Sequence, residues 1–271
     1  MTLLLTGANG QLGTLIKKHL TERGATFLEG SRTPPAGGRR VDYTDPAGLE
    51  QAFAGVTKLI LISAPSGDRV TLHRNAVTAA KNAGVEHIIY TSVTEAPTSP
   101  LSLAVDHKAT EEAIRDAGLT FTFLRNNMYH ENYTGQLAHT EGVFVTSAGP
   151  GLLASAARDD FALAAAVVAT TPGHENTAYE LTGSTAWTFD DFAAQVASIT
   201  GKPFVHKSIP AAELRAGYVA AGLPEEAAEV FTDIYVHIAD GALADVRPDL
   251  EKLIGRLATP LADSIRAAVG G

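Results

Sequence analysis

The sequence predicts an α/β fold in which a doubly wound parallel sheet is followed by a smaller, mostly helical C-terminal lobe. Through the first half of the chain, short segments that are apolar along their whole length alternate with longer segments of helical periodicity. Such strands are buried on both faces of a parallel sheet, because helices cover both faces. After about Pro172 the alternation loosens and helical segments dominate. We therefore expect a sheet domain over residues 1–172 and a capping lobe over residues 173–271.

The elements of the sheet domain follow one another in a regular order. The expected strands are Thr2–Thr6, Ala25–Leu28, Lys58–Ser63, His87–Ser92 and Thr120–Leu124. The expected helices between them are Gln11–Arg23, Pro46–Ala54, Arg69–Ala83 and Ala104–Ala117. Each helix is followed by a glycine, the residue that suits the left-handed position after a helix end. Repeated strand-helix-strand units with right-handed crossovers wind into an open sheet.

The second half of the chain predicts separate elements rather than a continued sheet. Two isolated strands are expected at Tyr179–Thr182 and Phe204–Lys207, and helices at Asp190–Ile199, Ala211–Ala221, Pro224–Ile238 and Asp249–Arg256. No long linker separates this lobe from the sheet, so the crevice between them is the expected ligand site.

Composition excludes several classes of function. The 271 residues include no cysteine, so thiol chemistry and cysteine-ligated metals are excluded, and the nine histidines lack the spacing of a metal site. Lys and Arg number 21 against 30 Asp and Glu, which argues against a broad nucleic-acid-binding face. No apolar stretch is long enough for a membrane span. We expect a cytoplasmic protein that binds neither nucleic acid nor membrane.

The segment TGANGQLG (Thr6–Gly13) follows the first strand and opens the first helix. In this context Gly7 makes a tight turn, Gly10 lets the backbone approach a pyrophosphate, and Gly13 lets the helix pack closely on the strand. The helix N-terminus adds partial positive charge. An ordinary glycine-rich turn is the alternative, but position and spacing favour a Rossmann-like dinucleotide site.

The end of the second strand bears on the choice of cofactor. An acidic residue there hydrogen-bonds the ribose of NAD, whereas an arginine suits the 2′-phosphate of NADP. Glu29 supports NAD if the strand ends at that residue. If the strand continues through Gly30, then Ser31 and Arg32 lie at the cofactor edge. We favour NADPH, while Arg32 as a solvated loop charge is the alternative.

Five segments in order along the whole chain carry a family resemblance. They are TGANGQLG, KLILISAP, HRNAVTAAKNAGVEHIIYTS, FTFLRNNMYHENY and IGRLATPLADSI. Together they resemble the NmrA-like atypical short-chain dehydrogenase/reductases, and among these the bacterial type 2 NAD(P)H:quinone oxidoreductases and triphenylmethane dye reductases. The resemblance implies a Rossmann-like NADPH domain, no flavin, and reduction of quinones or similar electron-poor acceptors.

The resemblance also implies which residues contact the cofactor. They are Gly7, Ala8, Asn9, Gly10, Gln11 and Leu12 at the phosphates, Arg32 at the 2′-phosphate, Ser63, Ala64 and Pro65 beside adenine and ribose, and Asn126, Asn127, Met128, Tyr129, His130 and Glu131 along the nicotinamide and acceptor. The chain departs from the family pattern where the quinone reductases carry a glycine and a tryptophan. Asn127 and Met128 stand at those positions, and they bear on the size of the acceptor pocket.

The catalytic pair typical of short-chain dehydrogenases is missing. Those enzymes place a tyrosine and a lysine four residues apart on one helix, where this chain has His107 and Glu111. A quinone needs less help than a carbonyl, because charge on its oxygen is delocalised. We expect direct hydride transfer from NADPH, with Tyr129 or His130 hydrogen-bonding the acceptor oxygen and His107, oriented by Glu111, donating or relaying a proton. The alternatives are a surface contact for His107 with Glu111 and simple packing for Tyr129 and His130.

A second class of function stays open from the sequence. The missing pair also fits an NmrA-type regulator that binds NADP(H) and senses redox state without turnover. The pocket segment NNMYHENY favours the enzyme, and we expect a monomer or homodimer in either case.

Overall fold

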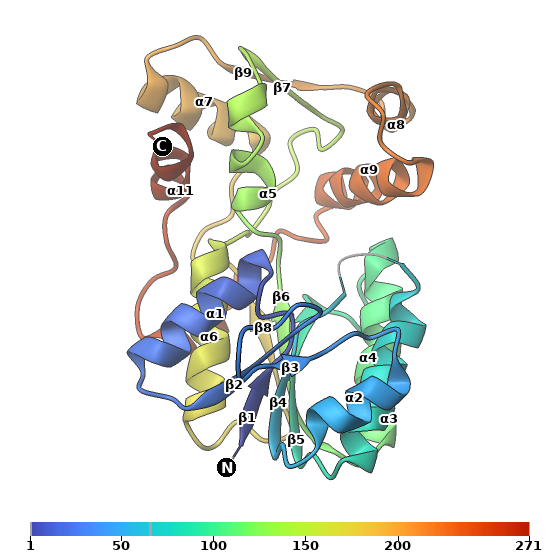
Figure 1. The fold of residues 1–271 in the computed structure, drawn as a ribbon. Coiled ribbons are helices and arrows are strands. Elements are labelled where there is room, and N and C mark those ends of the chain that lie inside the picture. Colours follow the sequence, from blue (N-terminus) through green and yellow to red (C-terminus); the bar gives the residue numbers. More distant parts are fainter. Residues whose placement is uncertain (1, 65–66, 271) are drawn as a thin grey trace.

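A seven-stranded parallel sheet forms the centre of the lower part of the molecule (Figure 1). The computed structural model describes residues 2–64 and 67–270. The strands, in their order across the sheet, are β3 (Arg39–Arg40), β2 (Phe27–Ser31), β1 (Leu3–Leu5), β4 (Lys58–Leu61), β5 (His87–Val93), β6 (Thr120–Asn126) and β8 (Thr177–Leu181). The order reverses direction between β1 and β4, which is the doubly wound topology that opens a crevice at the carboxyl ends of the strands. The predicted fold class is confirmed.

Helices cover both faces of this sheet, as the apolar strands require. One face carries α1 (Gln11–Glu22), α6 (Arg158–Thr170) and α10 (Asp249–Ile254), and the other carries α2 (Pro46–Phe53), α3 (Arg69–Asn82) and α4 (Ser102–Asp116) (Figure 1). Strand β1 shows why its sequence is apolar throughout. Leu3 and Leu5 pack in the core beneath α1 and α6, while Leu4 packs in the core beneath α2 and α3.

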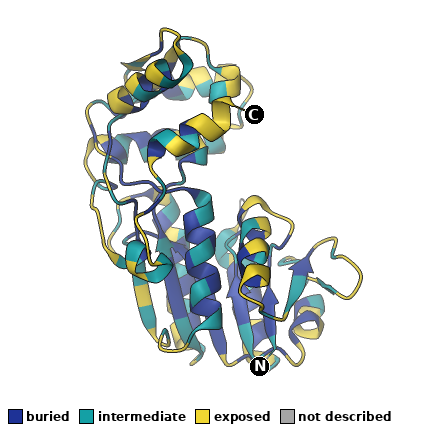
Figure 2. Cartoon of the chain, turned by 90° about the vertical axis from the view of Figure 1, so that its left-hand side faces the viewer, coloured by how far each residue is buried: buried dark blue, intermediate teal, exposed yellow. Residues whose placement is uncertain are grey.

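A second lobe lies above the carboxyl ends of the strands (Figure 1). It contains α5 (Glu131–Thr134), the 3-10 helix η1 (Leu137–His139), β7 (Val143–Thr146), α7 (Phe189–Thr200), β9 (Val205–Ser208), α8 (Ala211–Ala220), α9 (Glu225–Ala239) and α11 (Leu261–Val269). Its core is aromatic, and the ring of Phe189 contacts those of Tyr133, Phe144 and Trp187. Figure 2 shows the strands of the sheet as largely buried, whereas the outer faces of the lobe's helices are exposed.

Segments of the sheet domain and of the second lobe alternate along the chain, which the sequence did not predict. The expected isolated strand at Tyr179–Thr182 is β8, which pairs with β6 at the edge of the main sheet. The expected strand at Phe204–Lys207 is β9, which pairs with β7 from an earlier part of the chain. A division at residue 172 therefore does not separate the sheet domain from the second lobe. Local sequence periodicity predicts a strand but does not indicate which distant strand it pairs with.

Helix α6 explains the alanine-rich run of the sequence. Eight of its residues are buried, among them Phe161 and Ala165, because the helix packs on the sheet with α1 and α10 beside it. Within residues 2–64 and 67–270, no helix combines the length and apolar character needed to cross a membrane.

Candidate functional site

The loop between β1 and α1 has the backbone that its glycines predict. Gly7 has φ of +61°, and a Cβ on Gly13 would lie 2.1 Å from the carbonyl oxygen of Gly7. Gly10 is the N-cap of α1, no side chain caps this helix, and its first turn holds no acidic residue. By contrast, the Asp45 side chain accepts a hydrogen bond from the first turn of α2. The N-terminus of α1 is therefore free to bind an anion through backbone N–H groups.

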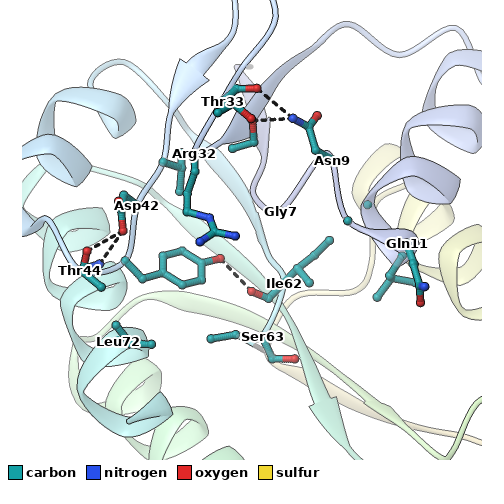
Figure 3. Close-up of a pocket in the computed structure, with 17 residues that line it drawn as sticks. Gly7, Asn9, Gln11, Arg32, Thr33, Asp42, Thr44, Ile62, Ser63 and Leu72 are labelled. Carbon is teal, nitrogen blue, oxygen red and sulfur yellow. Dashed lines mark hydrogen bonds between the residues drawn. The ribbon is translucent and has the colours of Figure 1, made fainter. Parts of the chain in front are cut away.

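A cavity of about 570 Å³ opens beside this loop, at the carboxyl ends of β1, β2 and β4 (Figure 3). We call it the cofactor groove. Its lining comprises Gly7, Asn9, Gly10, Gln11, Leu12, Gly13, Ser31, Arg32, Thr33, Val41, Asp42, Tyr43, Thr44, Ile62, Ser63, Ala64 and Leu72. Its volume lies in the range of small-molecule and cofactor sites.

Most of the predicted phosphate and adenosine contacts lie in the groove, with one exception. Ala8 does not line it, because its side chain is buried and its N–H donates to the carbonyl of Gly30 at 3.0 Å. Ser63 and Ala64 do line it, and Pro65 lies outside the described residues.

The second strand satisfies the condition set for NADPH. Strand β2 continues through Gly30 to Ser31, so Arg32 is the first residue beyond it. The Arg32 side chain is exposed and extends into the groove (Figure 3). Glu29 does not line the groove, because its carboxylate pairs with Lys17 of α1 at 2.9 Å. The acidic residue that would indicate NAD is thus tied to the helix.

Part of the groove comes from residues that the sequence reasoning missed, among them Thr33, Tyr43 and Ile62. The Asn9 amide donates to the Ser31 hydroxyl at 3.1 Å and to the Thr33 carbonyl at 2.9 Å, which joins the glycine loop to the end of β2. Tyr43 donates to the Ile62 carbonyl at 2.8 Å and fixes the loop before α2 to the end of β4. Burial raises the pKa of Tyr43, which keeps its hydroxyl protonated. A tyrosine in an irregular loop carries no periodic signal that could have revealed this role.

A smaller cavity of about 120 Å³ lies next to the groove, at the carboxyl ends of β5 and β6. We call it the β5–β6 pocket. Its lining comprises Ser63, Thr91, Ser92, Val93, His107, Asn126, Asn127, Met128, Tyr129 and Asn132. Ser63 lines both cavities. Asn126 presents a buried Oδ1 that has no hydrogen-bond partner in the part of the chain that the structure describes.

Two of the residues predicted along the nicotinamide do not reach this pocket. Both ring nitrogens of His130 are occupied, Nε2 by the Ser155 carbonyl at 3.0 Å and Nδ1 by the Ser264 hydroxyl at 2.9 Å. Burial lowers the pKa of His130 to about 4, so the ring is a neutral structural link. The Glu131 carboxylate accepts from the backbone N–H of Arg158 and thereby holds the start of α6. The predicted acceptor contact by His130 is therefore not supported by its position.

Tyr129 does line the β5–β6 pocket. Its ring makes an edge contact with Phe161 and lies 5.0 Å from the Arg158 guanidinium carbon, while its hydroxyl lies 3.4 Å from the Asn126 amide nitrogen. Burial raises the pKa of Tyr129, so its hydroxyl stays protonated and can donate a hydrogen bond.

His107 also lines the pocket, but its surroundings differ from the prediction. Its Nδ1 lies 2.8 Å from the Tyr90 hydroxyl, and burial lowers its pKa to about 3. Glu111 does not orient it, because this carboxylate is bound by Ser92, Arg115 and Arg125. A surface contact is equally wrong, since both residues are buried where α4 faces β5 and β6. His107 is therefore neutral at pH 7 and unsuited to acidic proton donation.

Among the residues that the structure describes, no group of three or more His, Asp or Glu side chains is arranged to hold a metal ion.

Comparison with known proteins agrees with the geometry of the groove. A family model described as NAD(P)H-binding matches residues 7–172. The chain belongs to this NAD(P)H-binding family. The NAD(P)H-binding protein is 41% identical to quinone oxidoreductase 2 of Escherichia coli strain K12, over 96% of each chain.

Two solved structures resemble this NAD(P)H-binding protein over nearly its whole length. One is an NADPH-dependent quinone oxidoreductase from Escherichia coli complexed with NADPH, with a TM-score of 0.93 and 40% identity over 98% of this chain and 99% of that one. The other is a triphenylmethane reductase from Citrobacter sp. complexed with NADP(H), with a TM-score of 0.92 and 40% identity over the same shares. These likenesses confirm the family resemblance predicted from the sequence.

Proposed function

We propose that this protein is an NADPH-dependent reductase that transfers hydride directly to quinones or similar electron-poor acceptors, including triphenylmethane dyes, without flavin or metal. One observation carries the proposal: the cofactor groove and the β5–β6 pocket adjoin at Ser63. A ligand that fills the groove can thus present its reactive end to a second, smaller cavity. The activities of the relatives support the same interpretation.

The residues of the groove fit a phosphorylated dinucleotide. The uncapped N-terminus of α1 and the glycine loop suit the pyrophosphate, and Arg32 suits the 2′-phosphate. The free Oδ1 of Asn126 is an acceptor for an amide N–H at the opposite end. When bound, NADPH supplies a hydride, which is two electrons and one proton, and a proton from solvent completes the hydroquinone.

The β5–β6 pocket places no charged side chain beside the acceptor. With His107 neutral, none of its lining residues is charged at pH 7. A flat, uncharged quinone can enter without leaving a buried charge unpaired, and a cationic triphenylmethane dye loses its charge when it takes up hydride. The Tyr129 hydroxyl and the Asn132 amide are lining groups that can donate to an oxygen on which negative charge develops.

The test is a stopped-flow assay of the purified protein with NADPH and 1,4-benzoquinone. We expect oxidation of NADPH well above the uncatalysed rate in protein that shows no flavin absorbance. No oxidation above the uncatalysed rate would contradict the proposal.

The regulator of the NmrA type is the second candidate, because Glu111 and His107 are both tied into buried hydrogen bonds instead of forming a catalytic pair. A regulator would bind NADP⁺ and NADPH but oxidise NADPH with neither quinone nor dye. The cytoplasmic location and the monomeric or homodimeric state stay predictions of the sequence.

A further inference from the structure

A chain of buried polar side chains lies behind the β5–β6 pocket. It consists of His73 on α3, Tyr90 on β5, and Thr110 and His107 on α4, and all four are buried. This series of hydrogen-bonded side chains begins at the cofactor groove, where the backbone N–H of Ala64 donates to His73 Nε2 at 2.8 Å. It ends at His107, which lines the pocket.

The direction of the hydrogen bonds at His73 is fixed by its partners. The Thr110 hydroxyl donates its single proton to the Asp106 carbonyl at 2.8 Å. Thr110 can therefore only accept from His73 Nδ1, which lies 2.8 Å away. The acceptor role of Nε2 toward Ala64 requires the same tautomer. His73 is thus neutral, with its proton on Nδ1.

This tautomer decides where the Tyr90 proton points. The Tyr90 hydroxyl lies 3.4 Å from His73 Nδ1, which is already protonated and cannot accept. It lies 2.8 Å from His107 Nδ1. The Thr110 hydroxyl also lies close to the Tyr90 hydroxyl, but it already accepts the proton of His73 Nδ1, so His107 Nδ1 is the acceptor left to this buried hydroxyl. Tyr90 therefore donates to His107 Nδ1, and the proton of neutral His107 sits on Nε2.

The protonated nitrogen of His107 is the one that can serve a ligand. Nε2 has no hydrogen-bond partner within the described parts of the chain. Nε2 is nevertheless not fully enclosed by protein atoms, and His107 as a whole keeps 7% of its surface exposed. The β5–β6 pocket is the opening that His107 lines, so an occupant of that pocket is the partner that Nε2–H can reach.

We propose that His107 is a hydrogen-bond donor to the acceptor oxygen through a fixed Nε2–H, and that Tyr90 is the positioning residue that holds this tautomer. The inference rests on the proposed reductase function and refines it. A quinone oxygen gains negative charge as hydride arrives, so a preorganised donor lowers the barrier. A triphenylmethane dye accepts hydride at its central carbon and gains no such charge on an oxygen. The donor therefore favours quinones over dyes.

The charged groups around His107 leave it neutral. From α3, Arg69 pairs with Asp106 at 3.4 Å, and on α4 the Glu111 carboxylate is bound by Arg125. No carboxylate of the described residues forms an ion pair with the ring, and burial together with His73 and Arg69 lowers its pKa to about 3. Protonation of His107 would also break its bond from Tyr90, since Nδ1 could no longer accept.

The tautomer itself is measurable without cofactor or acceptor. Long-range proton–nitrogen correlation spectra of ¹⁵N-histidine-labelled protein at pH 7, assigned with His107→Gln, should show His107 protonated on Nε2 and not on Nδ1. Tyr90→Phe should give a mixture of the two tautomers. A proton on Nδ1, or a doubly protonated ring, in the unmodified protein would overturn the inference.

Kinetics with two acceptors tests the role of that proton. We expect the ratio of kcat/KM for 1,4-benzoquinone to kcat/KM for crystal violet to fall about three- to tenfold in Tyr90→Phe, the size expected for one hydrogen bond. His107→Leu should lower it at least as far, and His107→Gln, which keeps an N–H, should lower it less. In the double variant, Tyr90→Phe should add nothing to His107→Leu, because its effect acts through that ring.

A matched control removes the same kind of bond elsewhere. The Tyr179 hydroxyl lies 2.7 Å from His174 Nδ1, outside both cavities, so Tyr179→Phe should leave the ratio unchanged. An unchanged ratio in His107→Leu, with both acceptors still reduced, would refute the role of His107 and leave the reductase function intact. Reduction of neither acceptor by the unmodified protein would instead refute the proposed function, and the role of His107 with it.

Discussion

The cofactor groove and the β5–β6 pocket adjoin at Ser63 but use different chemistry. The groove offers backbone N–H groups at the start of α1 and an exposed guanidinium on Arg32. The pocket offers mostly buried side chains, and burial lowers the pKa of His107 so that its ring is neutral. The groove suits a highly anionic ligand, whereas the lining of the pocket carries no charge. One site can therefore hold two reactants of opposite character side by side.

The neutral histidines around the pocket give the largest expected effect, on stability. Burial lowers the pKa of His73 and His130 to about 4 and that of His107 to about 3, from an ordinary 6.5. The unfolded chain binds protons below pH 6.5 that the folded chain does not, so this stabilisation is complete above pH 6.5 and is lost as pH falls towards the folded pKa values. At pH 5 each of the three histidines lowers the free energy of unfolding by about 2 kcal/mol relative to its value well above pH 6.5.

Urea unfolding at pH 7, 6 and 5 measures this loss. Near pH 5, the difference between the numbers of protons bound by the unfolded and the folded chain should be smaller by about one in His107→Gln than in the unmodified protein, and the slope of the unfolding free energy against pH should fall accordingly. A free energy of unfolding that did not change between pH 7 and pH 5 would show that these rings are not held neutral.

A change at Gly13 should break the groove and spare the pocket. A Cβ there would meet the Gly7 carbonyl oxygen at 2.1 Å, and a backbone atom cannot be displaced as a flexible side chain can. We expect Gly13→Ala to lower the free energy of unfolding by about 1–3 kcal/mol or more, as overpacking does, and to weaken NADPH binding at least about tenfold. Calorimetric titration and urea unfolding measure the two effects.

Gly217 provides the matched control for this change. It lies in α8 with nothing within 4 Å of an added Cβ, so Gly217→Ala should leave NADPH binding unchanged. Tight NADPH binding by Gly13→Ala would mean that the backbone of the turn can move away from the added Cβ without loss of the site.

Arg32→Ala should have a smaller effect, confined to one phosphate. Charge-assisted hydrogen bonds contribute about 1.5–3 kcal/mol, so NADPH should bind about ten- to a hundredfold more weakly while NADH binding is unchanged. The exposed Arg266 of α11 is the control, because its change to Ala removes the same charge far along the chain. Equal weakening for NADPH and NADH would place Arg32 away from the 2′-phosphate.

The groove was largely predictable because its determinants are local. The roles of Gly7 and Gly13 follow from spacing within one turn, and the place of Arg32 follows from where β2 ends. The pocket was predictable only as a segment. His130 faces Ser155 and Ser264, and the second of these lies 134 residues away in sequence.

The same reason explains the misreading of His107. Its partner Tyr90 lies on β5, the strand on which α4 packs. The sequence suggested Glu111 instead, which lies four residues along the same helix. Helical spacing places two residues on one face but does not say what that face meets.

The most direct test of the central claim follows the hydride itself. NADPH carrying deuterium in the transferred position is reacted with crystal violet in ordinary water, and the leuco dye is analysed by mass spectrometry. Direct transfer between two ligands in adjoining cavities predicts deuterium retained at the central carbon of the dye. A leuco dye without deuterium, for NADPH labelled on either face of the nicotinamide, would contradict direct transfer.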